Sequence, residues 1–199
     1  MRTRTPQIAI DLIKPFEAFT ADWYLCPAEK WTIGWGLVEN TISGINRDTT
    51  PGPIDVAFAD ELLHASLDEI FYPSVEKALP RAHVFKRAAA ASLVYNIGVR
   101  AFERSTLHKA MLRNDLNGIQ REWPRWRLAG GRVQPGLVRR REVELVLYNE
   151  GWERAKRSMR AHRIIEMDRL DVQPAAEVIS YEELKKRARE QLSRELGDG

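Results

Sequence analysis

The sequence contains one cysteine, Cys26, which excludes an intramolecular disulfide and any zinc site built from several thiolates. Its four histidines, at positions 64, 83, 108 and 162, lack the short spacing of metal ligands, so we expect neither a metal nor another cofactor. The chain also lacks an uncharged apolar run of the roughly 18 residues that a membrane span requires. The basic N-terminus leads into no long apolar stretch, so no secretory signal is expected.

Charge is unevenly distributed along the chain, although the net charge is only +3. Residues 39–76 contain eight acidic side chains and one basic side chain, whereas residues 121–163 contain twelve lysines and arginines and five glutamates. This distribution predicts either a polarised surface that attracts a polyanion or two ordinary solvated faces. No ordered nucleic-acid-binding motif accompanies the basic region, so we expect no nucleic acid as a partner.

The composition, with 44% hydrophobic and 30% charged residues, is typical of a folded protein with a core. Residues 8–19 carry apolar side chains at helical spacing, and Pro15 predicts a kink or an early end in that helix. Residues 23–37 are rich in aromatic and β-branched types and contain two glycines, which predicts short strands of a small sheet. Residues 40–53 hold turn formers and predict a loop.

Helical periodicity dominates the rest of the chain. The nearly all-apolar segment 88–99 predicts a buried central helix, and a further helix is expected over about 137–168. A capping box at Ser180 and Glu183 predicts a charged helix that continues to about Leu196. The sequence therefore predicts an α+β fold, in which a small N-terminal β element packs on a mainly helical body with a helical C-terminal tail.

The most specific motif is Glu17 followed by Cys26 and Thr32, at the spacing E-x8-C-x5-T, and Thr32 begins the segment T-I-G-W-G. Further ordered motifs are Y-N-I-G at 95–98, A-F-x-x-S-T-L at 101–107 and R-W-x-x-A-G-G…G-L-x-x-R-R-x-x-E at 125–144. Together these motifs resemble the phage lysozymes, or endolysins, of the muramidase type. The resemblance covers roughly residues 7–150.

The resemblance implies a lysozyme-like catalytic domain over residues 1–150, with a small β lobe at about 20–53 and a helical lobe at about 54–150. Residues 151–199 are expected to form a helical, charged extension beyond the family core. Its basic beginning, with Trp152 and Met159 as apolar anchors, suggests binding to the cell wall or the outer membrane. Pairing with a virion protein or another copy is a second hypothesis, and a simple solvated helical extension is the interpretation that we favour.

The resemblance implies catalytic roles for Glu17, Cys26 and Thr32. A general acid must be protonated near neutral pH, and an apolar surrounding favours the protonated form of a carboxyl group, which Phe16 and Phe19 could supply. Cys26 and Thr32 would hold the attacking water, and a thiolate could also stabilise the transition state or attack directly. The alternatives are a surface glutamate, a buried structural cysteine and an ordinary strand threonine.

Asn96, Arg140 and Arg141 are candidates for substrate-binding or supporting roles. The resemblance implies that one arginine turns inward and pairs with the Glu17 region, and we expect at least one of the two to face solvent. Asn96 could contact sugar or serve helix packing. Trp126 is expected to fill the core rather than to stack on substrate.

These motifs predict a glycoside hydrolase of the lysozyme type, a muramidase that cleaves the β-1,4 bond between N-acetylmuramic acid and N-acetylglucosamine in peptidoglycan. The expected role is host lysis by a phage or prophage endolysin, made in the host cytoplasm and acting in the periplasm after a separate holin opens the membrane. The alternatives are a virion-associated lysozyme for cell entry, a lytic transglycosylase, and a catalytically inactive lysozyme fold that serves as a binding or structural module.

Overall fold

The computed structural model describes residues 4–26 and 29–162, so the predicted helix from Ser180 to Leu196 lies outside the described residues. The described chain divides into two compact units. The sheet unit comprises residues 17–26 and 29–66, and the helical unit comprises residues 4–16 and 67–162. The boundary at Ser66 and Leu67 differs from the lobe boundary near residue 53 that the sequence suggests, because the first helix after the loop packs on the sheet.

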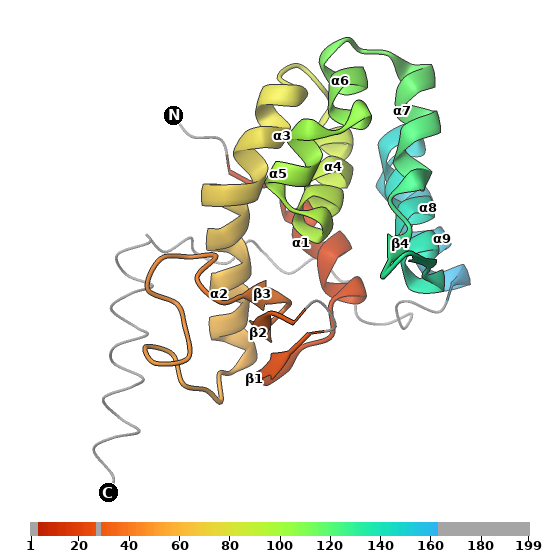
Figure 1. Cartoon of the computed structure of the whole chain (residues 1–199). Coiled ribbons are helices and arrows are strands. Elements are labelled where there is room, and N and C mark those ends of the chain that lie inside the picture. The colour runs from red at the N-terminus through yellow and green to blue at the C-terminus, as the bar shows by residue number, and fades with distance from the viewer. Residues whose placement is uncertain (1–3, 27–28, 163–199) are drawn as a thin grey trace, which may run out of the picture. The chain divides into compact units, whose positions relative to one another are not determined.

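A three-stranded antiparallel sheet forms the centre of the sheet unit, with the strand order β1 (Thr20–Leu25), β2 (Trp31–Gly34) and β3 (Leu37–Val38). Residues 39–53 form a long loop, and the helix α2 (Val56–Ser66) follows it and contacts β2 and β3 (Figure 1). The predicted strands and loop are therefore confirmed. The absence of a Cβ lets the backbone of Gly34 approach Ala59 on α2, because an added Cβ would lie 3.2 Å from the Ala59 Cβ.

The helical unit begins with α1 (Gln7–Ile13), which ends before Pro15 and continues as a short 3-10 turn, as the proline predicts. The remaining helical segments of this unit among the described residues are the π-helical turn Leu67–Phe71, α3 (Tyr72–Ala78), α4 (Val84–Ile97), α5 (Val99–Arg104), α6 (Thr106–Leu112), α7 (Leu116–Glu122), the 3-10 turn Trp123–Arg125, α8 (Pro135–Glu150) and α9 (Trp152–Ala161). A two-stranded hairpin, β4 (Leu128–Ala129) and β5 (Arg132–Val133), precedes α8.

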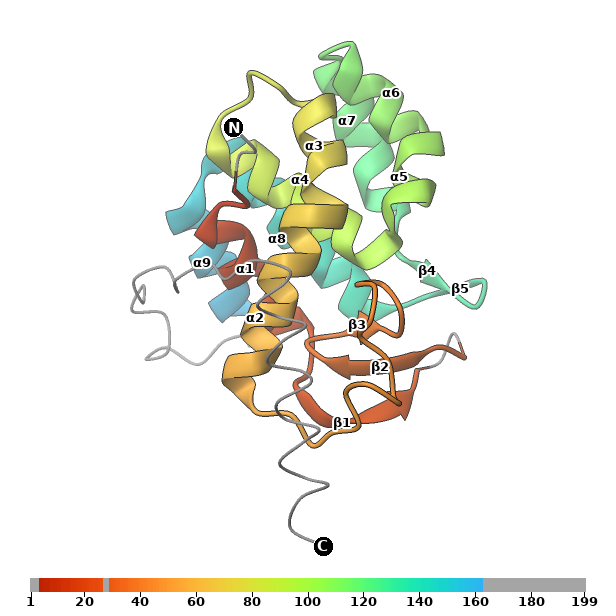
Figure 2. The ribbon, with the colours of Figure 1, turned by 90° about the vertical axis from the view of Figure 1, so that its left-hand side faces the viewer.

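The predicted central helix is α4. Its four consecutive alanines at positions 88–91 are all 0% exposed, and the helix contacts α1, α3 and α8 (Figure 2). A run of alanines has no wide side chain on any face, so neighbouring helices can approach α4 on several sides. The core of the unit therefore forms around this alanine-rich helix.

The helix expected over 137–168 is wrong in its extent, because Gly151 divides it into α8 and α9. Gly151 adopts a φ of +88°, which ends α8 and turns the chain. Trp152 and Met159 then pack into the core from α9, at 9% and 0% exposure. The residues expected to be apolar anchors for the wall or the outer membrane are instead core residues of the helical unit.

Among residues 4–26 and 29–162, no helix is long and apolar enough to cross a membrane. The same residues contain no cluster of three His, Cys, Asp or Glu side chains that could hold a metal ion.

Candidate active site

Glu17 lies between the end of the first helical segment and β1, where the chain is neither helix nor strand. Its half-buried carboxyl group is held over the loop that joins β2 to β3. A Cβ on Gly36 of this loop would lie 2.9 Å from Oε2 of Glu17 and 3.5 Å from its Cδ. The glycine therefore leaves the space that the carboxyl group occupies, and its φ of +88° is one that other residues rarely adopt.

Cys26 and Thr32 are brought together at the hairpin of β1 and β2 by one backbone carbonyl. The backbone N–H of Cys26 donates to the oxygen of Lys30 at 2.9 Å, and the hydroxyl of Thr32 donates to the same oxygen at 3.0 Å. Thr32 is 3% exposed, whereas Cys26 is half-buried. Since the Thr32 proton is directed at Lys30, its oxygen lone pairs are left to accept a hydrogen bond from another group.

Tyr24 on β1 is related to both the Glu17 carboxyl group and the pair Cys26 and Thr32. It faces Thr32 across the strand pair, and the residue is 38% exposed. Burial raises the pKa of Tyr24 most, and the negative charges of Glu17 and Cys26 raise it further. Tyr24 is thus the strand partner of Thr32 and is influenced by the charges of Glu17 and Cys26, although the sequence motifs did not single it out.

Aromatic side chains support the same region. Phe19 packs against Trp35 with ring centroids 5.3 Å apart, and the Trp35 indole N–H donates to Asp60 on α2 at 2.6 Å. Trp35 is the neighbour of Gly36, so this contact helps to fix the loop that lies against Glu17. The side chains present are thus a carboxyl, a thiol and a hydroxyl group beside aromatic rings, which can transfer a proton and orient a small nucleophile.

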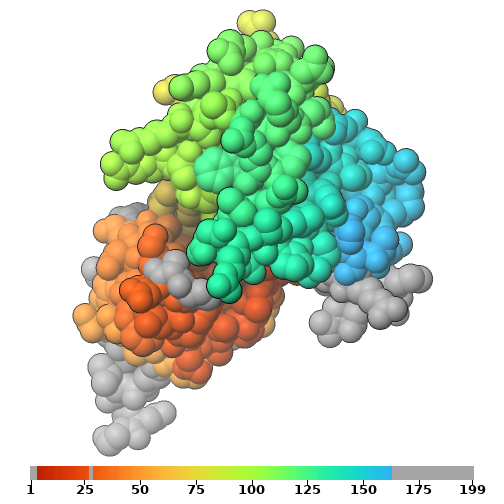
Figure 3. Space-filling view, turned by 45° about the vertical axis from the view of Figure 1, so that its right-hand side comes forward, coloured from red at the N-terminus to blue at the C-terminus, as the bar shows by residue number. Residues whose placement is uncertain are grey.

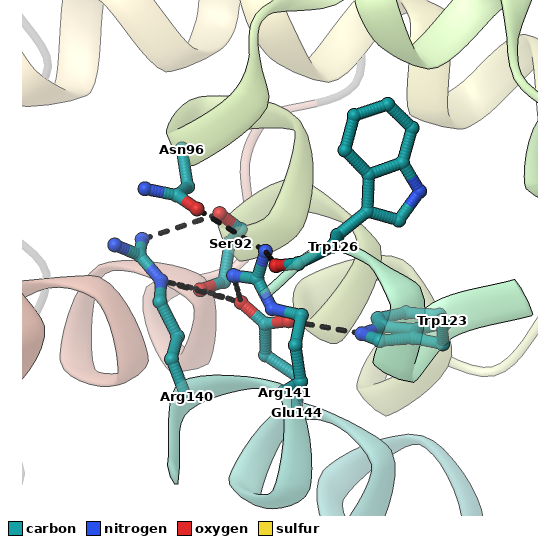
Figure 4. Close-up of polar contacts among 7 residues, drawn as sticks. All are labelled: Ser92, Asn96, Trp123, Trp126, Arg140, Arg141 and Glu144. Carbon is teal, nitrogen blue, oxygen red and sulfur yellow. Dashed lines mark hydrogen bonds and ion pairs between the residues drawn. The ribbon is translucent and has the colours of Figure 1, made fainter. Parts of the chain in front are cut away.

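Arg140 and Arg141 lie in the helical unit and are 2% and 1% exposed, so the expectation that at least one faces solvent is wrong. Both bind the carboxylate of Glu144, one turn further along α8 (Figure 4). The Nη2 atom of Arg141 lies 2.7 Å from Oε1 of Glu144, and the Nε atom of Arg140 lies 3.3 Å from the same oxygen. The predicted pairing of an arginine with the Glu17 region stays a prediction.

Glu144 is 0% exposed and also accepts two neutral hydrogen bonds. The Ser92 hydroxyl on α4 donates to Oε1 at 2.7 Å, and the Trp123 indole N–H donates to Oε2 at 2.9 Å. This Glu144 cluster therefore ties α4 and the 3-10 turn at Trp123 to α8. The sequence motif contained Glu144, but no residue-level signal distinguished it from a surface glutamate.

Asn96 and Trp126 are joined to this cluster through Arg141. The Nη1 atom of Arg141 donates to Oδ1 of Asn96 at 3.1 Å and to the backbone oxygen of Trp126 at 3.3 Å. Figure 4 shows the Trp126 ring directed away from the cluster, and the ring is half-buried against the helical core, which agrees with the expected core role. The structure thus brings Asn96, Arg140 and Arg141 together as one polar group.

Comparison with known proteins identifies relatives of this chain. The family described as phage lysozyme matches residues 14–144. An endolysin of Bacillus phage PZA is 34% identical over 149 residues, which are 73% of this chain and 55% of that protein. An endolysin of Acyrthosiphon pisum secondary endosymbiont phage 1 is 32% identical over 145 residues, which are 69% of this chain and 92% of that protein. The chain thus spans about half the length of the first relative and nearly all of the second.

Two solved structures share the fold. An endolysin from Escherichia coli O157:H7 phage FAHEc1 aligns with a TM-score of 0.63 and 25% identity, covering 76% of this chain and 97% of that one. The muramidase domain of SpmX from Asticaccaulis excentricus aligns with a TM-score of 0.62 and 23% identity, covering 74% of this chain and 99% of that one. These alignments confirm the lysozyme-like α+β fold expected from the sequence.

Replacing the buried carboxylate tests the Glu144 cluster. Glu144→Gln removes the carboxylate charge that two buried guanidinium groups bind, so we expect a loss of about 3–5 kcal/mol in the free energy of unfolding. Urea unfolding at neutral pH, followed by circular dichroism, measures this loss.

The matched control is Glu150→Gln on the same helix, where the ion pair with Arg154 is exposed. We expect this control to stay within about 1 kcal/mol of the wild type. Equal stability of the two variants would show that the Glu144 cluster is not an important support of the helical unit.

Proposed function

Because the chain belongs to the phage lysozyme family, we propose that it is a muramidase, which hydrolyses the β-1,4 bond between N-acetylmuramic acid and N-acetylglucosamine in bacterial peptidoglycan. The observation that carries this proposal is the position of the Glu17 carboxyl group, held over Gly36 in the sheet unit that also joins Cys26 and Thr32 through one backbone carbonyl. An acid of this kind and a separate group for the nucleophile are what glycoside hydrolysis needs.

Glu17 acts as the general acid in the proposed reaction. It gives its proton to the glycosidic oxygen as the bond from this oxygen to the anomeric carbon breaks, so the leaving sugar departs as a neutral alcohol. The anomeric carbon then carries positive charge, which a nearby anion stabilises. Cys26 supplies this anion when its thiol is ionised, since a thiolate is a full negative charge on a polarisable atom.

Thr32 and Cys26 position the attacking water. The Thr32 hydroxyl donates to the Lys30 carbonyl, so the water donates one hydrogen to the Thr32 oxygen. Cys26 accepts the second hydrogen as the water oxygen bonds to the anomeric carbon, and a hemiacetal with a new hydroxyl group is released. Direct attack by the thiolate is the alternative course, and it would form a thioglycosidic bond that water cleaves in a second step.

Host lysis is the role that we propose for this activity. Its support is that relatives similar over most of this chain are named endolysins, in a Bacillus phage and in an aphid endosymbiont phage. An enzyme with this role is a glycosidase that degrades the host wall.

The first test replaces the acid. We expect Glu17→Gln to lower the rate of peptidoglycan digestion by about 10²–10⁴-fold, because the amide cannot donate a proton to the leaving oxygen. Mass spectrometry of the released fragments should show reducing-end muropeptides from the wild type. Asp48→Asn, which removes an exposed carboxylate from the loop of the same unit, should leave the rate unchanged. Fragments with anhydro ends would show that the reaction is transglycosylation and not hydrolysis. No release of fragments by a folded wild-type protein would overturn the proposed activity.

The second test separates charge from size at Cys26. Cys26→Ala removes the anion and should lower kcat by about 10²-fold or more, whereas Cys26→Asp restores a negative charge and should recover much of the loss. Thr32→Ser keeps the hydroxyl group and should stay active, whereas Thr32→Val lacks it and should lose activity.

Proton NMR of the anomer that forms first distinguishes attack by a held water from direct attack by the thiolate. One displacement inverts the anomeric centre, and two displacements retain its configuration. Full activity of Cys26→Ala would contradict any role of Cys26 in the reaction.

The third test concerns the space at Gly36. Gly36→Ala places a Cβ 2.9 Å from the Glu17 carboxylate oxygen, so the carboxyl group must move and we expect kcat to fall at least ten-fold. Gly44→Ala is the matched control, because Gly44 has a similar φ of +81° and no atom within 4 Å of the added carbon. Both variants carry an alanine at a positive φ, which strains the backbone. Measuring Tm for both variants shows how much this strain lowers the stability of each. Equal kcat for the two variants would show that the Gly36 space does not position Glu17.

A further inference from the structure

The hairpin of β4 and β5 is the most exposed ordered element of the helical unit. Ten consecutive residues, 127–136, are exposed, and Figure 2 shows the hairpin extending away from the helices of its unit. Two of these residues are large and apolar, since Leu128 is 57% exposed and Val133 is 53% exposed. A single exposed leucine needs no explanation, but two on one small ribbon form a patch.

The strand register separates apolar from basic side chains. Leu128 is the cross-strand partner of Val133, so their side chains project from the same face of the ribbon. Ala129 is the partner of Arg132, and these side chains project from the opposite face. Arg127 directly precedes β4, and its backbone oxygen accepts from Gln134, so the strand alternation extended by one residue puts Arg127 on the face of Arg132. The hairpin is an amphipathic ribbon with one apolar face and one arginine-bearing face.

The charge around the ribbon has one sign. Between Trp123 and Arg141 the sequence has six arginines and no aspartate or glutamate. Two of them, Arg140 and Arg141, are held by Glu144, whereas Arg127, Arg132 and Arg139 are exposed and form no ion pair with the described residues. These three guanidinium groups are therefore open to an external anion.

The ribbon has a defined shape despite its exposure. Gly130 and Gly131 have φ values of +57° and +73°, as the two central residues of a tight hairpin turn require. The Gln134 N–H donates to the Arg127 oxygen at 3.0 Å, and Arg141 of the Glu144 cluster donates to the Trp126 oxygen just before the ribbon. The hairpin is thus closed at its base and attached to the buried cluster. In the space-filling view of Figure 3, this part of the chain (teal) lies open on the surface of the helical unit.

We propose that this hairpin binds the surface of an anionic phospholipid bilayer. Leu128 and Val133 enter the boundary between headgroups and acyl chains, while Arg127 and Arg132, reaching from the other face, bind lipid phosphates. Neither the apolar face nor the arginine-bearing face alone would select this partner. A soluble polyanion leaves the apolar face in water, and an uncharged apolar partner leaves the arginines without anions.

The experiment measures binding of the full chain to sedimented vesicles. We expect binding to vesicles that contain phosphatidylglycerol, much weaker binding to pure phosphatidylcholine, and a decrease as salt is added. The double substitution Arg127→Gln and Arg132→Gln should lower the partition coefficient about 30-fold, since each basic residue near an anionic surface contributes about five-fold. Leu128→Gln with Val133→Gln should lower it about ten-fold.

Two control pairs come from the same unit. Leu112→Gln with Leu116→Gln removes side chains that are 54% and 51% exposed but lie beside Asp115, and Arg104→Gln with Arg113→Gln removes the same charge away from the hairpin. Both control pairs should bind as the wild type does. Equal losses in the control and hairpin variants would overturn the proposal, because binding would then follow net charge or general hydropathy.

Digestion of lipid-free cell wall provides the last comparison. The hairpin variants should digest it as the wild type does. Impaired digestion with unchanged vesicle binding would assign the hairpin to the wall and overturn the lipid proposal. The vesicle measurement needs no hydrolysis, so a failure of the proposed muramidase activity leaves its result intact.

Discussion

The helical unit depends on one buried negative charge, the carboxylate of Glu144. Two guanidinium groups, a serine hydroxyl and an indole N–H converge on its two oxygens. Moving such charges out of water is costly, and their mutual attraction offsets that cost only when the remaining donors and acceptors are satisfied. Both oxygens of Glu144 are satisfied by partners on α4, on the turn at Trp123 and on α8. The cluster fixes where three segments distant in sequence meet, and through Arg141 it also fixes the base of the β4–β5 hairpin.

The narrow helix α4 makes this arrangement sterically possible. Its alanines at 88–91 let neighbouring helices come close, and Ser92 follows them directly, where its hydroxyl reaches Glu144. A larger residue in this run would separate α4 from α8 and lengthen the hydrogen bond from Ser92 to the carboxylate. The apolar packing and the polar cluster are therefore one constraint, since the packing excludes the water that would otherwise weaken the ion pairs.

The sequence predicted the elements whose signals are local. The break at Pro15, the strands around Gly34, the loop over 40–53 and the central alanine-rich helix all follow from backbone restrictions or apolar periodicity within one short segment. The end of α8 at Gly151 was missed, because a lone glycine in a charged helical pattern is a weak breaker and its effect depends on Trp152 packing into the core. The burial of Arg140 and Arg141 was missed for a similar reason. Arginine in a basic run is ordinarily solvated, and only the distant partners on α4 and at Trp123 make burial favourable.

The candidate site shows the same division between local and distant information. The motif identified Glu17, Cys26 and Thr32 as residue types, but the feature that places the Glu17 carboxyl group is an absence of atoms at Gly36, nineteen positions along the chain. The sequence pattern contains this glycine, yet a glycine after a strand ordinarily indicates only a turn. Its φ of +88° serves the turn, and the missing Cβ serves the carboxyl group. One residue thus satisfies a backbone requirement and a side-chain requirement together.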